Sequence, residues 1–229
     1  MFVSLGGFPR SKSTTRSPRG HPPGRRQYLW GVRLRSWLAR PRQLAARLRY
    51  WLWEKTHPDA PWLCPGAVAF LDEHLDRSMT ALEFGSGRST AWLAQRVATL
   101  TSVEHQVGWY GEVAVQLDAK GVADTDLRLV PLDHPASEPE WEAYDPVPRY
   151  VRVLDEFEDG SLDLIVVDGH YRTNCARAGV PKLKPGGLLL VDDSQWWESS
   201  RDLGVPDDWP VASHSTNGLK TTTIWRRPA

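Results

Sequence analysis

Apolar and polar residues follow two alternating patterns along residues 60–229, and this alternation predicts the class of fold. Apolar runs of strand length lie at residues 80–84, 100–104, 127–132, 161–168 and 186–193. Amphipathic segments with helical spacing lie beside them, at residues 66–75, 89–97, 109–119, 150–157 and 175–183. Strands that alternate with helices form a parallel sheet covered on both faces. We therefore expect an α/β domain.

The C-terminal part of the pattern predicts a β-hairpin. Asn217-Gly218 separates two β-rich runs, at residues 209–215 and 219–227, and this dipeptide favours a tight two-residue turn. The hairpin adds one antiparallel strand to the sheet. Residues 134–148 contain four prolines and no clear periodicity, so we expect an irregular loop there.

The first 57 residues differ from the rest of the chain. Residues 1–27 are rich in Ser, Pro, Gly and Arg, which predicts a disordered basic tail, although this composition is also typical of transit peptides. Residues 28–57 predict an Arg- and Trp-rich helical arm, with two amphipathic helices separated near Pro41. The remaining residues, 58–229, form the predicted main domain.

Charge is distributed unevenly between these parts. Residues 1–55 contain 13 Lys and Arg residues and one acid, whereas residues 56–229 contain 15 Lys and Arg residues and 27 acids. The arm either packs on the domain and covers its substrate site, or residues 28–55 contact an anionic membrane surface. No nucleic-acid-reading motif accompanies the basic charge, so we expect no specific nucleic-acid partner.

The chain lacks the sequence signals of membrane spans, secretion and disulfide frameworks. No apolar run reaches the roughly 18–20 residues that span a bilayer, and the N-terminus has no secretory apolar segment. Cys64 and Cys175 are the two cysteines and are far apart in the sequence. We expect a cytoplasmic protein, with peripheral membrane contact as the alternative.

A glycine loop follows the first predicted strand, in the sequence ALEFGSGRSTAW. Gly85 and Gly87 permit a tight turn and close approach of a ligand to the backbone around Ser86. A dinucleotide-binding fingerprint would have a third glycine at position 90, where this chain has Thr90. The loop on its own is equally compatible with a simple strand-to-helix turn.

Two acids follow the next two predicted strands. Glu104 ends the second strand, where a carboxylate can accept both hydroxyls of a ribose. Asp133 follows the third strand, where the edge of an adenine would lie. A solvated surface acid is the alternative interpretation for each residue.

Three further acids follow the fourth and fifth strands, in VVDGHYR and LLVDDS. Asp168, Asp192 and Asp193 would meet at one edge of the sheet and offer oxygen ligands to Mg²⁺. Alternatively, one acid of the pair caps the next helix. His170 lies two residues after Asp168 and is a candidate general base, with a structural histidine as the alternative.

The segments LEFGSGRST, SVEH, DLIVVDGHYR and PKLKPGGLLLVDDS, in this order, resemble the class I S-adenosylmethionine-dependent methyltransferases. The resemblance extends from about Trp62 to Trp225. It implies a Rossmann-like three-layer α/β/α sandwich with a seven-stranded, mostly parallel sheet and one antiparallel strand. The helices predicted for the arm precede this domain and are not part of the resemblance. The resemblance also implies that Glu83 and the Gly85-Ser86-Gly87 loop hold the methionine half of S-adenosylmethionine.

The paired acids are similar to those of metal-assisted O-methyltransferases, including enzymes that modify sugars. That resemblance implies Asp168, Asp192 and Asp193 as Mg²⁺ ligands and His170 as the general base. The expected acceptor is a hydroxyl of a small molecule, a sugar or a glycan precursor. An NAD-dependent oxidoreductase and a non-catalytic member that binds a cofactor or partner are the alternatives, and the oligomeric state stays open.

Overall fold

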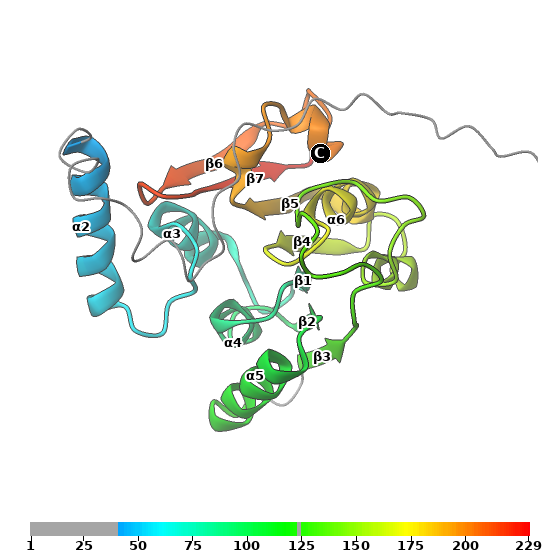
Figure 1. Cartoon of the computed structure of the whole chain (residues 1–229), viewed down its shortest axis with the longest axis horizontal. Helices are drawn as coiled ribbons and strands as arrows, with labels where there is room; N and C mark the ends of the chain where they lie inside the picture. Colours follow the sequence, from blue (N-terminus) through cyan, green and yellow to red (C-terminus); the bar gives the residue numbers. More distant parts are fainter. Residues whose placement is uncertain (1–40, 123–124) are drawn as a thin grey trace, which may run out of the picture.

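A computed structural model describes residues 41–122 and 125–229, with side chains from residue 45 onward. Its centre is a seven-stranded sheet in the order β3-β2-β1-β4-β5-β7-β6 (Figure 1). The strands are β1 (Thr80–Phe84), β2 (Thr99–Glu104), β3 (Thr125–Leu129), β4 (Leu162–Val167), β5 (Leu183–Asp192), β6 (Val211–Thr216) and β7 (Thr221–Arg226).

Five α-helices and four short 3₁₀ helices accompany the sheet in the described residues. The α-helices are α2 (Pro41–Thr56), α3 (Pro65–His74), α4 (Arg88–Ala94), α5 (Val107–Ala119) and α6 (Arg172–Gly179). The 3₁₀ helices are η1 (Val151–Glu156), η2 (Val180–Lys182), η3 (Ser194–Trp196) and η4 (Ser200–Leu203).

Strand directions confirm the predicted sheet. The pairs β1–β2, β2–β3, β1–β4 and β4–β5 are parallel, whereas β7 is antiparallel to both β5 and β6. The chain order reverses between β1 and β4, because β2 and β3 lie on one side of β1 and β4 on the other. Ligands of open α/β sheets bind outside the carboxyl ends of the strands at such a switch point.

The hydrophobic core has two layers, one on each face of the sheet. On β4, Ile165 and Val167 face a cluster formed with α6 and η1, while Leu164 and Val166 face a cluster formed with α3, α4 and α5. This burial on both faces explains why β4 is a continuous apolar run in the sequence. The predicted Rossmann-like three-layer α/β/α sandwich is therefore confirmed.

Some predicted boundaries shift for local reasons. The third strand ends at Leu129 instead of residue 132, and Pro131 has no N–H with which to extend the ladder. The predicted helix at 150–157 is the 3₁₀ helix η1. The predicted helix at 175–183 begins earlier, at Arg172, and ends as the 3₁₀ helix η2, which contains Pro181.

Helix α2 is the part of the predicted arm that the described residues include, and the predicted break near Pro41 lies at their edge and stays a prediction. Tyr50 is buried and Trp53 packs against the core, so one face of α2 lies on the domain. Leu48, Trp51 and Leu52 are each more than half exposed on the other side. None of the helices described here has the length and apolar character needed to cross a bilayer.

The three-part division at residues 27 and 57 stays a prediction. Helix α2 ends at Thr56, next to the second predicted boundary. The tail and the first predicted helix of the arm lie outside the described residues.

Candidate functional site

The carboxyl ends of β1 and β4 meet at two glycines. Gly85 has a φ of +94°, and a Cβ there would lie 2.6 Å from the Cα of Gly169. A Cβ on Gly169 would in turn lie 2.7 Å from the amide nitrogen of Gly85. Such separations are too short for a side chain at either position, so the two loops are fixed against each other. Gly87 differs, because a Cβ there would make only ordinary contacts, the nearest at 3.8 Å from Trp109.

A buried carboxylate lies beneath the glycine loop. Glu83 is fully buried, and its Oε2 accepts hydrogen bonds of 2.6 Å from the hydroxyls of Thr90 and Ser102. Its Oε1 has no hydrogen-bond partner in the part of the chain that the structure describes. Burial raises the pKa of Glu83 to about 7, against the lowering effect of these hydroxyls. A buried carboxylate with an unused oxygen is suited to a cationic or hydrogen-bond-donating ligand.

Thr90 connects this carboxylate to the loop above it. Its hydroxyl accepts a 2.8 Å hydrogen bond from the amide of Gly87 and donates to Glu83. Ser86 is also held, through its hydroxyl to Ser102 at 2.8 Å and through its carbonyl to the indole of Trp109 at 2.6 Å. Hydrogen bonds to Thr90, Ser102 and Trp109 therefore fix the conformation of the loop.

Glu104 ends β2 with its carboxylate in a fixed orientation. Oε1 accepts hydrogen bonds from the amides of His105 and Gln106, at 2.7 and 2.8 Å. Both bonds fall on one oxygen, which leaves the second carboxylate oxygen available to hydroxyl donors. The residue is nearly fully buried, so this oxygen is suited to hydroxyl donors of a bound ligand.

Asp133 lies in the loop after β3, where both of its carboxylate oxygens contact Arg149. One oxygen accepts from the Arg149 amide and the other from its guanidinium, each at 2.6 Å. These hydrogen bonds and the nearby charge lower the pKa of Asp133. The carboxylate thus anchors the segment that precedes η1, and a contact with adenine stays a prediction.

His170 is buried beside the carboxyl end of β4. Its ring lies 5.5 Å from that of His105 and 4.8 Å from that of Tyr171, between ring centroids. Its Nε2 has no hydrogen-bond partner among the residues described. Burial, together with His105 and Arg172, lowers the pKa of His170 to about 4, so its imidazole is neutral at pH 7.

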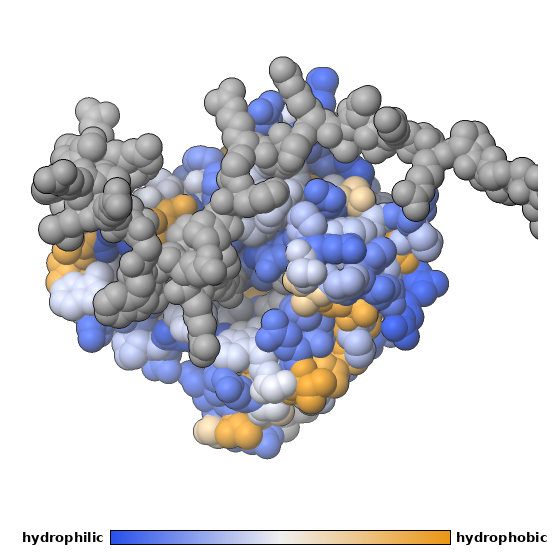
Figure 2. All heavy atoms as spheres, in the orientation of Figure 1, coloured by the Kyte–Doolittle hydropathy of each residue, from blue (hydrophilic) through white to orange (hydrophobic). Residues whose placement is uncertain are grey.

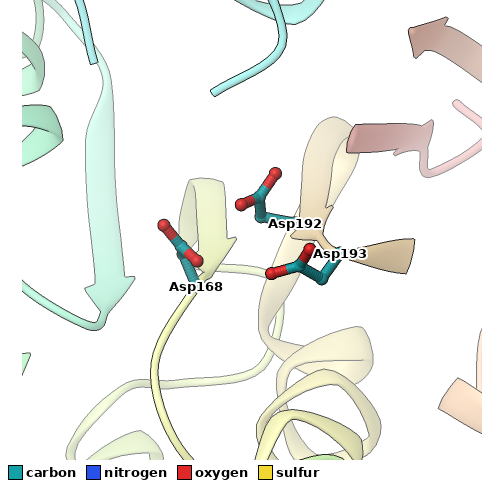
Figure 3. Close-up of side chains that lie close together, drawn as sticks. All are labelled: Asp168, Asp192 and Asp193. Carbon is teal, nitrogen blue, oxygen red and sulfur yellow. The ribbon is translucent and has the colours of Figure 1, made fainter. Parts of the chain in front are cut away.

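The three predicted acids converge at the ends of β4 and β5 (Figure 3). Asp168, Asp192 and Asp193 each place a carboxylate oxygen within 4.8 Å of the others. Asp193 has a φ of +55°, an uncommon conformation for a residue other than glycine, which turns the chain immediately after β5. The structure thus brings together the residues that the sequence assigns to one site.

Two protein cations already neutralise part of the charge of this acid cluster. The guanidinium of Arg172 lies 3.2 Å from a carboxylate oxygen of Asp168 and 3.2 Å from one of Asp193. The ammonium of Lys220 donates to a carboxylate oxygen of Asp192. Three carboxylates therefore face two cations, and a divalent ion would compete with both. The residues present do not fit a Mg²⁺ site as the sequence predicts.

Trp62 and Trp109 form an aromatic wall beside the glycine loop. Their rings stack with centroids 6.4 Å apart, and the guanidinium of Arg88 lies 5.4 Å from the centre of the Trp62 ring. Arg88 thus stacks on an aromatic face at the start of α4.

Comparison with known proteins supports one family. The family model described as "Methyltransferase domain" matches residues 82–194, which include the glycine loop, Glu104, His170 and the acid cluster. Together with the observed sheet, this match supports a class I S-adenosylmethionine-dependent methyltransferase domain. No protein of curated function matches the chain.

Solved structures agree with this methyltransferase fold. A methyltransferase from Geobacter sulfurreducens superposes with a TM-score of 0.53 at 11% identity, over 82% of this chain and 88% of its own. A methyltransferase-like protein from Silicibacter pomeroyi gives 0.52 at 23% identity, over 74% and 89%. SMU.1697c from Streptococcus mutans, solved in complex with SAH, gives 0.50 at 10% identity, over 69% and 93%. At these identities the likeness concerns the fold.

Sequence reasoning missed the roles of four residues of the candidate site. Thr90 and Ser102 hold Glu83, while Arg172 and Lys220 neutralise the acid cluster. Arg172 lies four residues after Asp168 at the start of α6, a spacing that could have revealed it. The antiparallel pairing of β5 with β7 sets Asp192 opposite Thr222, two residues from Lys220. That register is a long-range feature that the local pattern does not contain.

Proposed function

We propose that this chain transfers the methyl group of S-adenosylmethionine to a hydroxyl oxygen of a small-molecule or carbohydrate acceptor. The observation that carries the choice of a hydroxyl is the buried Nε2 of His170 beside the end of β4, which has no hydrogen-bond partner among the described residues. A hydroxyl is a weak nucleophile that must lose its proton as it attacks, and a neutral imidazole can accept that proton. The methyltransferase domain supports the cofactor.

In this proposal the cofactor lies across the ends of β1 and β2. The ammonium of its methionine half pairs with Glu83, whose Oε1 has no other hydrogen-bond partner in the described chain. The backbone of Gly85, Ser86 and Gly87 borders the same half. The ribose hydroxyls bind Glu104, whose carboxylate the amides of the following residues already orient.

The reaction is an in-line substitution at the methyl carbon. The acceptor oxygen forms a bond to this carbon as the carbon–sulfur bond breaks. The electron pair of the broken bond stays on sulfur, which gives S-adenosylhomocysteine. The hydroxyl proton passes to Nε2 of His170. A bound Mg²⁺ would polarise the acceptor hydroxyl, but we leave this ion out of the reaction because two protein cations already pair with the acid cluster.

The test is formation of S-adenosylhomocysteine by the full-length protein with panels of phenols and sugars. Mass spectrometry of the acceptor should show one added methyl group on oxygen. His170→Gln should lower turnover at least about a hundredfold, since general-base catalysis contributes this much. His74→Gln, on α3, is the control. Methylation confined to amine or thiol acceptors, or full activity of His170→Gln, would contradict the proposal.

We also propose that α2 contacts an anionic membrane surface. Leu48, Trp51 and Leu52 form an exposed apolar group at the edge of the molecule where α2 lies (Figure 2). The ammonium of Lys55 lies 5.7 Å from the centre of the Trp51 ring, so positive charge adjoins the apolar face. Apolar side chains beside basic ones are typical of helices that lie in a membrane interface.

Vesicle sedimentation tests this contact. The protein should pellet with vesicles of phosphatidylcholine and phosphatidylserine, and less with phosphatidylcholine alone. The double variant Leu48→Ser/Leu52→Ser should lose most of this binding. Val115→Ser, which removes an equally exposed apolar residue from α5, should not. Equal pelleting of the double variant and the wild type would remove the membrane proposal.

A further inference from the structure

We propose that Arg172 and Lys220 take the place of a divalent cation in the acid cluster of Asp168, Asp192 and Asp193. The site would then work without a bound metal. The part of this inference that concerns catalysis rests on the proposed methyl transfer, whereas the part that concerns metal binding does not.

Arg172 is built into the site and is not a flexible surface residue. It is 1% exposed and has the largest of the fully buried side chains. Its Nε donates to the carbonyl of Gly169 at 3.0 Å, and one terminal nitrogen donates to the carbonyl of Asp192 at 2.6 Å. The guanidinium centre also lies 4.6 Å from the centre of the Trp196 ring. These contacts fix a planar cation between the β4 and β5 ends.

The charge of Arg172 is maintained in this position. Burial opposes the charge, but the carboxylates of Asp168 and Asp193 outweigh burial and raise the guanidinium pKa above its usual value. Both carboxylates therefore face a permanent positive charge that belongs to the chain.

Lys220 supplies the second cation from the turn between β6 and β7. Its ammonium contacts one carboxylate oxygen of Asp192 and donates to the carbonyl of Trp62 at 2.5 Å. The other oxygen of Asp192 accepts a 2.6 Å hydrogen bond from the hydroxyl of Thr222. Both oxygens of this fully buried carboxylate are therefore occupied by protein donors.

A divalent ion would have to displace these donors. Mg²⁺ binds oxygens at about 2.0–2.1 Å and needs lone pairs that are free to coordinate it. Here the ion would also approach a guanidinium and an ammonium in a region of low dielectric, where like charges repel strongly. Arg172 and Lys220 instead act as positioning residues, which hold the three carboxylates in place at the ends of β4 and β5.

Titration with Mn²⁺, followed by the electron paramagnetic resonance signal of the free ion, tests metal binding directly. The wild-type protein should take up no Mn²⁺ at the cluster. Lys220→Met should gain Mn²⁺ binding that the wild type lacks, because one competing charge is gone. Adding Asp192→Asn to Lys220→Met should abolish the gain. Lys184→Met, which breaks the pair with Asp163, should match wild type.

Melting temperatures show whether each variant folds, and Lys220 is the preferred target because Arg172 is more deeply buried. Methyl transfer by the wild type should be the same with EDTA and with added Mg²⁺. Mn²⁺ binding by wild type that Asp192→Asn abolishes would overturn the inference, as would activity that EDTA removes and Mg²⁺ restores. A Lys220→Met protein that gains no Mn²⁺ binding would also overturn it. Absence of methyl transfer to hydroxyls would end the proposed function, but the Mn²⁺ result would still decide this inference.

Discussion

The amide of Gly85 and the backbone of Gly169 pack so closely that neither residue can carry a side chain. A Cβ on Gly169 would lie 2.7 Å from the nitrogen of Gly85 and would also collide with the hydroxyl of Tyr150. The ends of β1 and β4 are thereby locked together at the switch point of the sheet.

Gly169→Ala should therefore lower the free energy of unfolding by about 1–3 kcal/mol, the usual cost of forcing extra volume into a packed site. Urea denaturation followed by tryptophan fluorescence measures the change. Gly111→Ala on α5, where a Cβ meets nothing within 4 Å, should be neutral or stabilising. If the two variants were equally stable, this tight contact would not exist in solution.

Gly87→Ala should distinguish an effect on cofactor binding from an effect on protein stability. Gly87 has an extended φ, and a Cβ there would make only ordinary contacts, so stability should change little. If the cofactor passes next to this backbone, the added methyl group should weaken S-adenosylhomocysteine binding by about 1–3 kcal/mol. Isothermal titration calorimetry measures the affinity, and a melting curve measures the stability. Unchanged affinity would place the cofactor away from Gly87.

Glu83 should make cofactor binding depend on pH. Its pKa of about 7 means that the carboxylate is mostly protonated at pH 6 and mostly ionised at pH 8. If only the ionised form pairs with the ligand ammonium, S-adenosylhomocysteine should bind about tenfold more tightly at pH 8 than at pH 6.

Titration of Glu83→Gln is the control for this effect, and its affinity should be weaker and independent of pH over the same interval. The raised pKa also has a consequence for the unliganded protein. Ionising a buried carboxylate opposes folding, so this group should lower stability as the pH rises from its unfolded pKa toward 8. A wild-type affinity that stays constant from pH 6 to 8 would show that Glu83 does not pair with the ligand.

Glu104→Ala should weaken S-adenosylhomocysteine binding by about 1–3 kcal/mol, because the ribose hydroxyls would lose their acceptor. Isothermal titration calorimetry measures the difference. Glu112→Ala removes an exposed acid from α5 and should bind like wild type. An unchanged affinity in Glu104→Ala would refute the ribose assignment.

The sequence predicted the strands best where burial on both faces imposes a continuous apolar run. Strand β1 occupies the predicted residues, and β4 differs from its prediction by one residue at each end, because such runs are bounded by polar or glycine residues. Residues 150–157 were less predictable. Apolar spacing there indicates a helix, but it does not distinguish an α-helix from the 3₁₀ helix η1.

The candidate site was predictable only in part. Acids that end parallel strands must share one edge of the sheet, so the grouping of Asp168 with Asp192 follows from strand order. The charge that neutralises Asp192 comes from Lys220, 28 residues later in the chain. Its position depends on the hairpin register, which no local pattern specifies.

The position of Lys220 also determines when the site can be completed. Lys220 lies in the turn between the last two strands, and it joins the β5 end to the Trp62 segment that precedes α3. The Lys220 contact with Asp192 therefore requires that the C-terminal hairpin has formed. A complete site depends on these last two strands even though they contribute no acid to it.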